Sequence, residues 1–355
     1  MYDLIVVGGG PAGLTATVYA IRKRIKVLLL TKDLGGATSF RLGLPWIDDY
    51  QLIRGWEIVD KFRSELEYLD FARHMEPVNK IEPRGEAFVV LTKGGGELET
   101  RAIIIASGTR QVRLDVPGEK EYFMKGVCYS ALSYAPLFID KTTMVIGDGD
   151  LALRSAAELA TVSKHVYLVR AGCANTSSPL CQKLSTAANV TILQGYQVVE
   201  IKGDEYARSV MVKSPDDKLS EIAVDGTFVE MALIPNSKMV EGLVKLDTQG
   251  RIMVDCANRT SVPGIFAAGD VTNTYAEQVL VAVGEEDHAV SAIPSLSKSQ
   301  RYTMESLSGS VAVAVKVSSE PSWPVYEPPA FATGGRFRRQ GGPLVAYLSE
   351  RSVKT

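Results

Sequence analysis

The stretch YDLIVVGGGPAGL, residues 2–14, joins an apolar run of strand length to a glycine cluster, and a helix pattern follows through about Arg24. Gly8, Gly10 and Gly13 fit the spacing G-x-G-x-x-G, in which the glycines permit a tight turn, close approach of a pyrophosphate and close helix–strand packing. A second apolar run at residues 27–30 follows the helix. The context on both sides therefore predicts a βαβ unit that binds a dinucleotide.

The composition is that of an ordinary globular protein, with 46% hydrophobic and 23% charged residues among 355. A net charge of −2 gives no reason to expect a nucleic acid or an anionic membrane as a partner. The first strand pattern begins at residue 2 and no apolar run reaches membrane-spanning length, so we expect a soluble, cytoplasmic protein. Four cysteines in a chain of this size do not make a disulfide scaffold.

A second unit repeats the first. An apolar run at 143–146 leads into Gly147-Asp148-Gly149-Asp150-Leu151-Ala152, which has the spacing G-x-G-x-x-A. A helix pattern at 153–161 and a strand pattern at 165–169 follow. Two such fingerprints in one chain are much less expected by chance than one, so the sequence predicts two dinucleotide sites.

The rest of the first 293 residues alternates strands, turns and helices. We expect a helix at about 55–71, strands at 78–81, 87–91 and 98–105, and a strand at 260–271 that ends on Gly269-Asp270 before a helix to about 293. An acid at such a point can hold a sugar or ribityl hydroxyl, while the helix N-terminus faces the ligand.

These motifs together resemble those of the FAD-dependent pyridine nucleotide–disulfide oxidoreductases, above all low-molecular-weight thioredoxin reductase. The matching segments follow the family's order and are residues 8–13, 35–36, 106–108, 117–119, 147–152 and 260–271. The resemblance implies an α/β fold with two Rossmann-like domains of the three-layer ββα type. It implies an FAD domain at 1–114 plus 247–295, a second nucleotide domain at 115–246 and a homodimer. A C-terminal extension, 296–355, goes beyond the family pattern.

The resemblance also implies which residues contact FAD. Thr31 stands where an acid usually takes the ribose hydroxyls, and Asp33 lies two residues later. The backbone of the last helix is expected near the flavin ring. The implied FAD contacts are Gly8, Gly10, Pro11, Ala12, Gly13, Thr31, Gly36, Val78, Ala106, Gly108, Asp270, Gln278 and Val279.

The sequence departs from the family at its redox-active pair. Where the family reads Gly-Val-x-x-Cys-x-x-Cys, this chain has serine at both cysteine positions, Ser130 and Ser133, with a solitary Cys128 nearby. A hydroxyl cannot form a disulfide or serve as a thiolate. Thioredoxin reductase chemistry by the usual route is therefore excluded.

The second nucleotide site also departs from the family. A basic cluster that clamps the NADPH 2′-phosphate is reduced to Arg170, which is followed by Ala171 and Gly172. We expect a dinucleotide to be held by Gly147, Gly149, Asp150 and Arg170. NADPH specificity is doubtful, and the site suits either NAD(P)H or a second FAD.

A loop with two cysteines, Cys173 and Cys181, replaces the phosphate clamp. Either these cysteines are unrelated, or they form a relocated redox-active disulfide. Such a loop normally lies far from the primary flavin, and a second flavin in the nucleotide domain would bridge that distance. This combination resembles the diflavin-linked disulfide oxidoreductases of cyanobacteria, and it implies two FAD per chain.

The tail is rich in apolar and aromatic residues, so we expect it to dock on the body of the protein. Trp323, Tyr326 or Tyr347 would stack on an open flavin face, and Arg338 and Arg339 would meet phosphates or solvent. His74, His165 and His288 are too scattered for a metal site, and Cys256 is expected in the core.

The sequence is interpreted as an FAD-dependent oxidoreductase that passes electrons through one or two flavins to a Cys173/Cys181 disulfide. Its expected partner is a redox protein or a small disulfide, with ferredoxin as one candidate donor. The alternatives are a ferredoxin- or NAD(P)H-linked flavin electron transferase without a disulfide step, and a redox-inactive flavin-binding protein.

Overall fold

The computed structural model describes residues 1–47, 56–69, 72–172, 178–274, 279, 281–284, 290, 314–315 and 325–326. Residues 1–294 form one compact unit and residues 295–355 a second one. Across these described ranges, none of the helices has both the length and the apolar character needed to cross a membrane.

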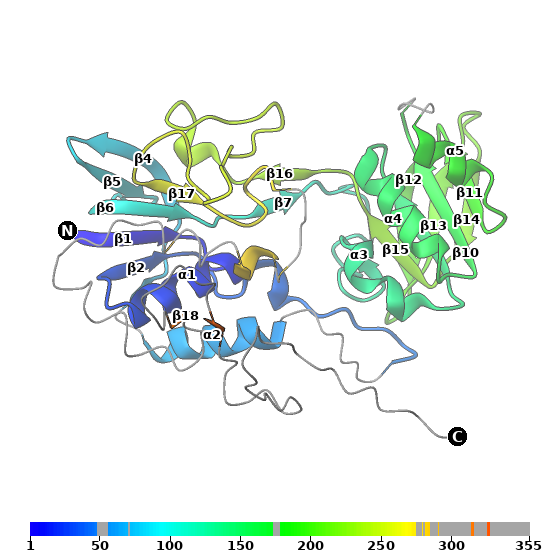
Figure 1. The fold of residues 1–355 in the computed structure, drawn as a ribbon. Helices are drawn as coiled ribbons and strands as arrows, with labels where there is room; N and C mark the ends of the chain where they lie inside the picture. The colour runs from blue at the N-terminus through cyan, green and yellow to red at the C-terminus, as the bar shows by residue number, and fades with distance from the viewer. Residues whose placement is uncertain are drawn as a thin grey trace, which may run out of the picture. The chain divides into compact units, whose positions relative to one another are not determined.

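The first sheet is built around β1, which pairs in parallel with β2 on one side and with β6 on the other. The long strand β6 also pairs in parallel with β17 and antiparallel with β5, so it belongs to two layers (Figure 1). The strands of this sheet are β1 (Tyr2–Val7), β2 (Val27–Leu30), β3 (Arg73–His74), β4 (Val78–Arg84), β5 (Ala87–Thr92), β6 (Glu97–Ile105) and β17 (Ile265–Ala267).

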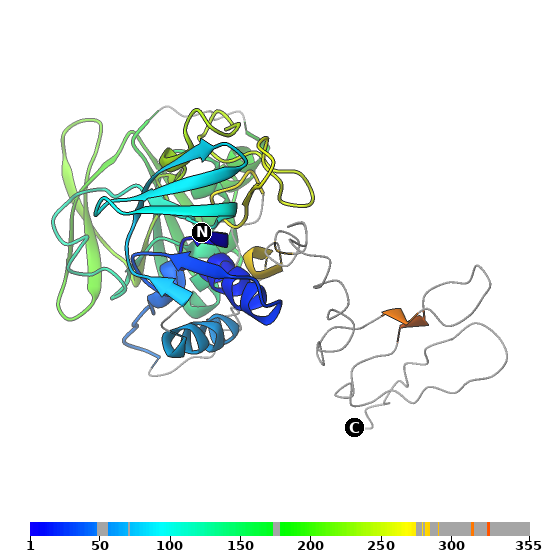
Figure 2. The ribbon, with the colours of Figure 1, turned by 90° about the vertical axis from the view of Figure 1, so that its left-hand side faces the viewer.

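Alternation along β1 divides the core between two faces of this sheet. Leu4 and Val6 pack with helices α1 (Pro11–Arg22) and α2 (Trp56–Tyr68), whereas Ile5 and Val7 pack with β4 and β5. Figure 2 shows α1 on the side of the parallel layer away from β4 and β5. Because successive strand residues point to opposite faces, a continuous apolar strand is required between two covering layers.

The second glycine unit has the same three layers. Its parallel sheet has the order β11-β10-β9-β15-β8, and an antiparallel sheet β12-β13-β14 covers one face. The strands are β8 (Val127–Cys128), β9 (Thr142–Ile146), β10 (His165–Arg170), β11 (Val190–Gln194), β12 (Gln197–Gly203), β13 (Ala207–Lys213), β14 (Leu219–Ala223) and β15 (Gly226–Val229).

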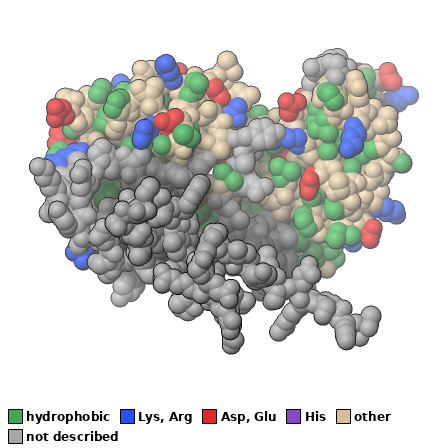
Figure 3. All heavy atoms as spheres, viewed as in Figure 1, with side chains coloured by type: hydrophobic (Ala, Val, Ile, Leu, Met, Phe, Trp, Pro, Cys, Tyr) green, Lys and Arg blue, Asp and Glu red, His purple; other side chains and the backbone are tan. Residues whose placement is uncertain are grey.

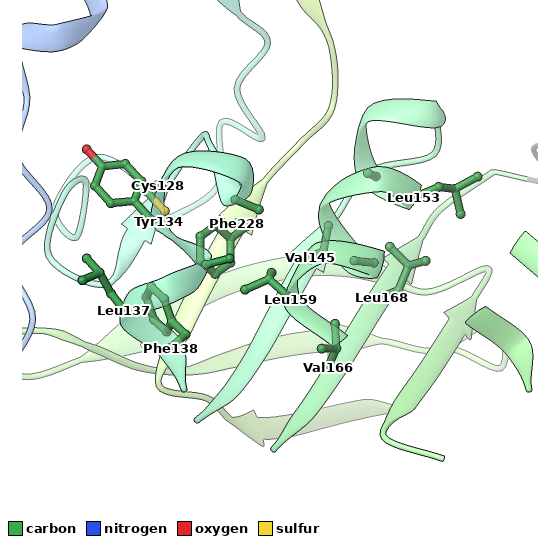
Figure 4. Close-up of a cluster of buried hydrophobic side chains, with 14 of the residues drawn as sticks. Cys128, Tyr134, Leu137, Phe138, Val145, Leu153, Leu159, Val166, Leu168 and Phe228 are labelled. Atoms are coloured by element: carbon green, nitrogen blue, oxygen red, sulfur yellow. The ribbon is translucent and has the colours of Figure 1, made fainter. Parts of the chain in front are cut away.

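Alternation again divides the core. Val145 of β9 packs with helix α4 (Asp150–Ala160), while its neighbours Met144 and Ile146 pack with β12 and β13. Figure 4 shows Val145, Leu159 and Leu168 meeting between α4 and the sheet. The short helices α3 (Ala131–Tyr134) and α5 (Pro179–Ser185) adjoin α4. Both glycine units therefore have the predicted ββα layering.

A two-stranded ribbon connects the two sheets. β7 (Thr109–Gln111) pairs antiparallel with β16 (Leu233–Pro235), with Gln111 opposite Leu233. Beside it, Ser107 Oγ donates to the Asn236 carbonyl at 2.7 Å, and Asn236 Nδ2 donates to the Ser107 carbonyl at 2.9 Å. The chain thus enters and leaves the second unit at neighbouring positions. The 3₁₀ turns of this first compact unit are η1 (Gly36–Ser39), η3 (Ala135–Phe138) and η4 (Lys238–Val240).

In residues 295–355 the structure describes β18 (Ala314–Val315), which pairs antiparallel with β19 (Val325–Tyr326). The predicted roles of Trp323, Tyr347, Arg338 and Arg339 lie outside the described residues, and docking of the tail stays a prediction. On the face seen in Figure 3, acidic and basic side chains of the described residues are interspersed, in keeping with the small net charge.

Candidate functional site

The first glycine loop joins β1 to α1, and two of its glycines are fixed by close packing. A Cβ on Gly8 would overlap the carbonyl oxygen of Ala106, and a Cβ on Gly13 would overlap the carbonyl oxygen of Gly8. Gly8 also has φ of 111°, which a side chain would strain. The loop backbone therefore requires glycine at both positions.

Gly10 differs, because no heavy atom of the described residues lies within 4 Å of the place where its Cβ would stand. Gly10 is the N-cap of α1 and Pro11 is the first helical residue. The open space thus lies at a helix N-terminus, where free N–H groups and the helix dipole favour an anion. This cradle fits the diphosphate of a dinucleotide such as FAD.

Three other segments meet at this loop. Gly35 N–H donates to the Gly9 carbonyl at 2.7 Å, and a Cβ on Gly36 would come 3.0 Å from Gly10 Cα. The buried residues Ala12, Ala106 and Ala282 form a cluster of their own, which brings the last helix to the start of α1. Gly269, with φ of 74°, lies against Ala12, and Asp270 follows it.

The remaining predicted FAD contacts lie at varied distances from the loop. Thr31 is buried beside it, but its hydroxyl donates to the Asp33 carbonyl at 2.6 Å. Val78 is part of the core at the start of β4, and the Gly108 carbonyl accepts from Asn236 N–H on the connecting ribbon. Val279 is helical and packs on the core, whereas Gln278 lies outside the described residues.

The second glycine loop repeats this geometry between β9 and α4. A Cβ on Gly147 would overlap the Glu230 carbonyl oxygen. In contrast, no heavy atom of the described residues lies within 4 Å of the place where a Cβ on Gly149 would stand. A cavity of about 250 Å³ lies at the carboxyl ends of β9 and β10. It is lined by Leu114, Ile146, Gly147, Asp148, Val169, Ala171, Tyr196, Gln197, Val198 and Met231. Asp150 is the exposed first residue of α4.

Arg170 does not occupy the position expected of a phosphate ligand. It is 1% exposed, and its guanidinium donates through Nη2 to the Asp148 carbonyl at 3.1 Å and through Nη1 to Cys181 Sγ at 3.2 Å. Its Nε has no hydrogen-bond partner among the described residues. Arg170 is the last residue of β10, and its buried guanidinium is hydrogen-bonded to the backbone of the glycine loop at Asp148.

At the site of the missing redox pair Ser130 is half-buried and Ser133 is exposed. Ser130 is the N-cap of α3 and Ser133 lies on that short helix. Cys128 is fully buried among Tyr134, Phe138 and Phe228 (Figure 4), so its thiol is a packing group. No motif in the sequence pointed to the buried Glu230, whose carboxylate accepts from Ala131 N–H at 2.8 Å and from Ser155 Oγ at 3.0 Å.

The remaining cysteines give a mixed result. Cys181 lies on α5 and is 5% exposed, while Cys173 lies outside the described residues, so their pairing stays a prediction. The expectation that Cys256 belongs to the core is wrong, because this residue is exposed. It lies in a turn closed by the Asp255 side chain, which accepts from Ala257 and Arg259 N–H groups.

A buried carboxylate fixes one wall of the second cavity. Glu119 is 1% exposed and accepts from Leu114 N–H at 2.9 Å, Asp115 N–H at 2.7 Å and Tyr129 Oη at 2.7 Å. Burial and this carboxylate raise the pKa of the Tyr129 hydroxyl well above its usual value. The cavity-lining Leu114 is thereby tied to Tyr129.

Known proteins match most of this chain. A component of the alkyl hydroperoxide reductase of Pseudomonas aeruginosa is 33% identical over 291 residues, which are 80% of this chain and 56% of that protein. NADH dehydrogenase of Bacillus subtilis is 30% identical over 286 residues, with the same coverage. The chain thus spans about half the length of the curated relatives it matches.

Solved structures match the fold over almost their whole length. Thioredoxin reductase from Streptococcus pyogenes superposes with a TM-score of 0.75 at 31% identity, covering 82% of this chain and 97% of that one. Thioredoxin reductase from Giardia duodenalis gives a TM-score of 0.73 at 27% identity, covering 81% and 96%. These matches confirm the predicted α/β, thioredoxin reductase-like fold.

The pyridine nucleotide–disulphide oxidoreductase family matches residues 2–285. Its thioredoxin reductase-like proteins are flavin-dependent oxidoreductases that bind FAD and use NAD(P)H. With two glycine loops in the family's order and relatives above 30% identity, the chain belongs to the pyridine nucleotide–disulphide oxidoreductase family.

Proposed function

We propose that this protein is an FAD-dependent disulfide oxidoreductase whose redox-active cysteines are Cys173 and Cys181. The observation that carries the flavin part is the open space at Gly10, the N-cap of α1. Gly8, Gly10, Gly13 and Gly36 would hold the diphosphate there. When bound, FAD supplies a ring that takes up and releases electrons.

The disulfide part rests on three features of the chain. The usual cysteine positions hold Ser130 and Ser133, Cys173 comes three residues after the end of β10 in the sequence, and Cys181 lies on α5. Two electrons and two protons would convert a Cys173–Cys181 disulfide to two thiols. Because Cys181 is 5% exposed, we assign Cys173 the attack on a disulfide of the partner and Cys181 the resolving step.

Electrons would reach this pair through the second glycine loop, which has its own open cradle at Gly149. That loop would hold either NAD(P)H or a second FAD. We propose a redox protein or a small disulfide as the partner, and a cytoplasmic homodimer as the working form. Ferredoxin is one candidate electron donor.

The burial of Cys181 favours one competing function, an electron transferase without a disulfide step. Its sulfur is in contact with the Arg170 guanidinium at 3.2 Å and belongs to the core cluster around α4. A sulfur held in this way exchanges with a partner only after α5 moves. In the competing function both cysteines are packing groups, and the flavin exchanges electrons with NAD(P)H or ferredoxin directly.

Thiol counting separates the two functions. We expect anaerobic photoreduction of the purified holoprotein to expose two additional thiols, and to expose none in the Cys181→Ser variant. Cys256→Ser is the matched control, since Cys256 is exposed and outside the proposed pair, and it should still gain two. Flavin reduction with an unchanged thiol count in the unmodified protein would establish the electron transferase instead.

A further inference from the structure

The second glycine loop carries an acid where the first loop has no side chain. In G-x-G-x-x-G numbering Asp148 corresponds to Gly9, and a Cβ on Gly9 would come 2.6 Å from Thr31 Oγ1. Val7 pairs with Leu30 in the first unit and Ile146 pairs with Val169 in the second, so Thr31 corresponds to Arg170 and Asp33 to Gly172. The Asp148 side chain contacts the segment that follows β10 at Gly172, which corresponds to Asp33 of the first site.

Backbone contacts fix this carboxylate at the edge of the cavity. Asp148 Oδ1 accepts from Gly172 N–H at 3.0 Å, and a Cβ on Gly172 would come 3.5 Å from Asp148 Oδ2. The Asp148 carbonyl is held in turn by Arg170 Nη2. Asp148 is only partly buried and lines the cavity of about 250 Å³ at the ends of β9 and β10.

The cavity contains no compensating positive charge within the described part of the chain. Its lining residues include no lysine, arginine or histidine. The sequence from Ala171 to Gln182 also lacks a basic residue. Arg170, the last residue of β10, is 1% exposed and donates to the Asp148 carbonyl. A phosphate on the 2′-oxygen of a ribose would therefore face a fixed carboxylate, and like charges repel.

We propose that Asp148 determines the specificity of the second site for an adenosine dinucleotide with a free ribose diol, and that it excludes the 2′-phosphate of NADPH. Its carboxylate accepts hydrogen bonds from the 2′- and 3′-hydroxyls, a role that an acid at the end of the second strand fills in other dinucleotide folds. Here the acid comes from inside the glycine loop. This inference rests on nucleotide binding at the second site and is independent of the cysteines.

NADH and a second FAD both present this diol, so the flavin count of the purified protein decides which one the site takes. With one FAD per chain, binding of ADP-ribose and of its 2′-phosphate to the holoprotein is measured by calorimetry. We expect ADP-ribose to bind at least tenfold more tightly, and we expect Asp148→Asn to bring the ratio close to one. If the unmodified protein instead contains two FAD per chain, the purified Asp148→Asn variant should contain close to one FAD per chain.

Two further variants make the test specific. Asp148→Glu keeps the charge and should retain part of the preference or of the second FAD. Glu158→Gln removes an exposed acid from the last turn of the same helix and should behave as the unmodified protein. FAD in the first site serves as the folding control for every variant.

Three outcomes would overturn the proposal. They are an equal or higher affinity for the 2′-phosphate, an unchanged Asp148→Asn variant, and a protein with one FAD that binds neither probe. None of them touches the thiol count, so the proposed disulfide function stands or fails separately.

Discussion

The two glycine loops of this chain have nearly the same backbone but very different surroundings. In each, the first glycine is packed against a carbonyl oxygen, of Ala106 in one loop and of Glu230 in the other. In each, the glycine before the helix, Gly10 or Gly149, faces open space. The cradle for a diphosphate is thus a property of the backbone, and it is present twice.

The side chains around the two cradles differ at corresponding positions. Gly9 and Thr31 of the first loop correspond to Asp148 and Arg170 of the second. The Thr31 hydroxyl donates to the Asp33 carbonyl, whereas Arg170 is a buried cation that donates to the Asp148 carbonyl. In the proposed function the backbone would hold the phosphates, while the side chains around each cradle would decide which nucleotide is attached to them.

The largest effect on stability is expected at Gly13, because the corresponding residue of the second loop is Ala152. The Cβ of Gly13→Ala would overlap the Gly8 carbonyl oxygen, so we expect a loss of about 3 kcal/mol in the free energy of unfolding and loss of FAD. The reverse change in the second loop, Ala152→Gly, should cost about 1 kcal/mol and leave FAD bound. Urea unfolding and flavin absorbance measure both. A stable, yellow Gly13→Ala protein would contradict the packing argument.

Gly10→Ala and Gly149→Ala separate binding from stability. Each added methyl group enters open space, so the free energy of unfolding of the apoprotein should change by less than about 0.5 kcal/mol. Because the methyl group would occupy the diphosphate position, we expect Gly10→Ala to weaken FAD binding by about 100-fold, equivalent to about 2.7 kcal/mol. Gly149→Ala should leave this FAD bound and weaken the second site. An equal loss of FAD affinity in Gly10→Ala and Gly149→Ala would contradict the assignment of separate ligands to the two loops.

The Tyr129 hydroxyl, which is linked through Glu119 to the cavity-lining Leu114, makes a contribution to stability that depends on pH. Its hydrogen bond to the buried Glu119 carboxylate predicts a loss of about 1.5 kcal/mol in Tyr129→Phe. Since folding raises the pKa of this hydroxyl, its contribution is fully present below about pH 10 and declines as the pH rises above that value.

Unfolding of Tyr129→Phe and of the unmodified protein, measured between pH 7 and pH 11, should therefore converge at the alkaline end. Tyr206→Phe is the matched control and should show no such convergence. A difference between Tyr129→Phe and the unmodified protein that grows above pH 10 would reverse the assigned sign.

The smallest effect is expected when the buried cation of the second loop is replaced by an apolar residue. Arg170→Leu removes a guanidinium whose Nε has no partner among the described residues, and a well-packed apolar replacement of a buried ion is commonly tolerated. We expect a change within about 1 kcal/mol in urea unfolding. We also expect an unchanged ratio of ADP-ribose to 2′-phosphate binding or, where the second site holds FAD, an unchanged flavin count. A selective loss of 2′-phosphate binding would restore Arg170 as a phosphate ligand.

Much of the fold could be predicted from the sequence, because alternating or continuous apolar runs and two glycine fingerprints specify each ββα unit. The predicted helix at 153–161 is observed as Asp150–Ala160, and the predicted strand at 165–169 as His165–Arg170. The first helix ends at Arg22, earlier than the expected Arg24, because Arg24 adopts φ of 58°. Such a local turn leaves no trace in the apolar pattern.

The candidate sites were less predictable, because spacing does not report where a side chain points. Arg170 carries the charge of a phosphate ligand, yet its orientation under the loop depends on Cys181 eleven positions later. Asp148 stood inside a recognised motif, but its approach to Gly172 is a tertiary contact. Cys256 lies in a strand-like stretch of the sequence, and its exposure follows from a turn made by its neighbour Asp255.

The antiparallel pairing of Gln111 with Leu233 means that the chain enters and leaves the second glycine unit through the same two-stranded ribbon. Because both connections run through this ribbon, the second unit could be replaced by another unit of the same type while the first sheet keeps its strand order. Replacing the chain between these two residues with the matching part of a relative would graft a new nucleotide preference onto an unchanged flavin cradle.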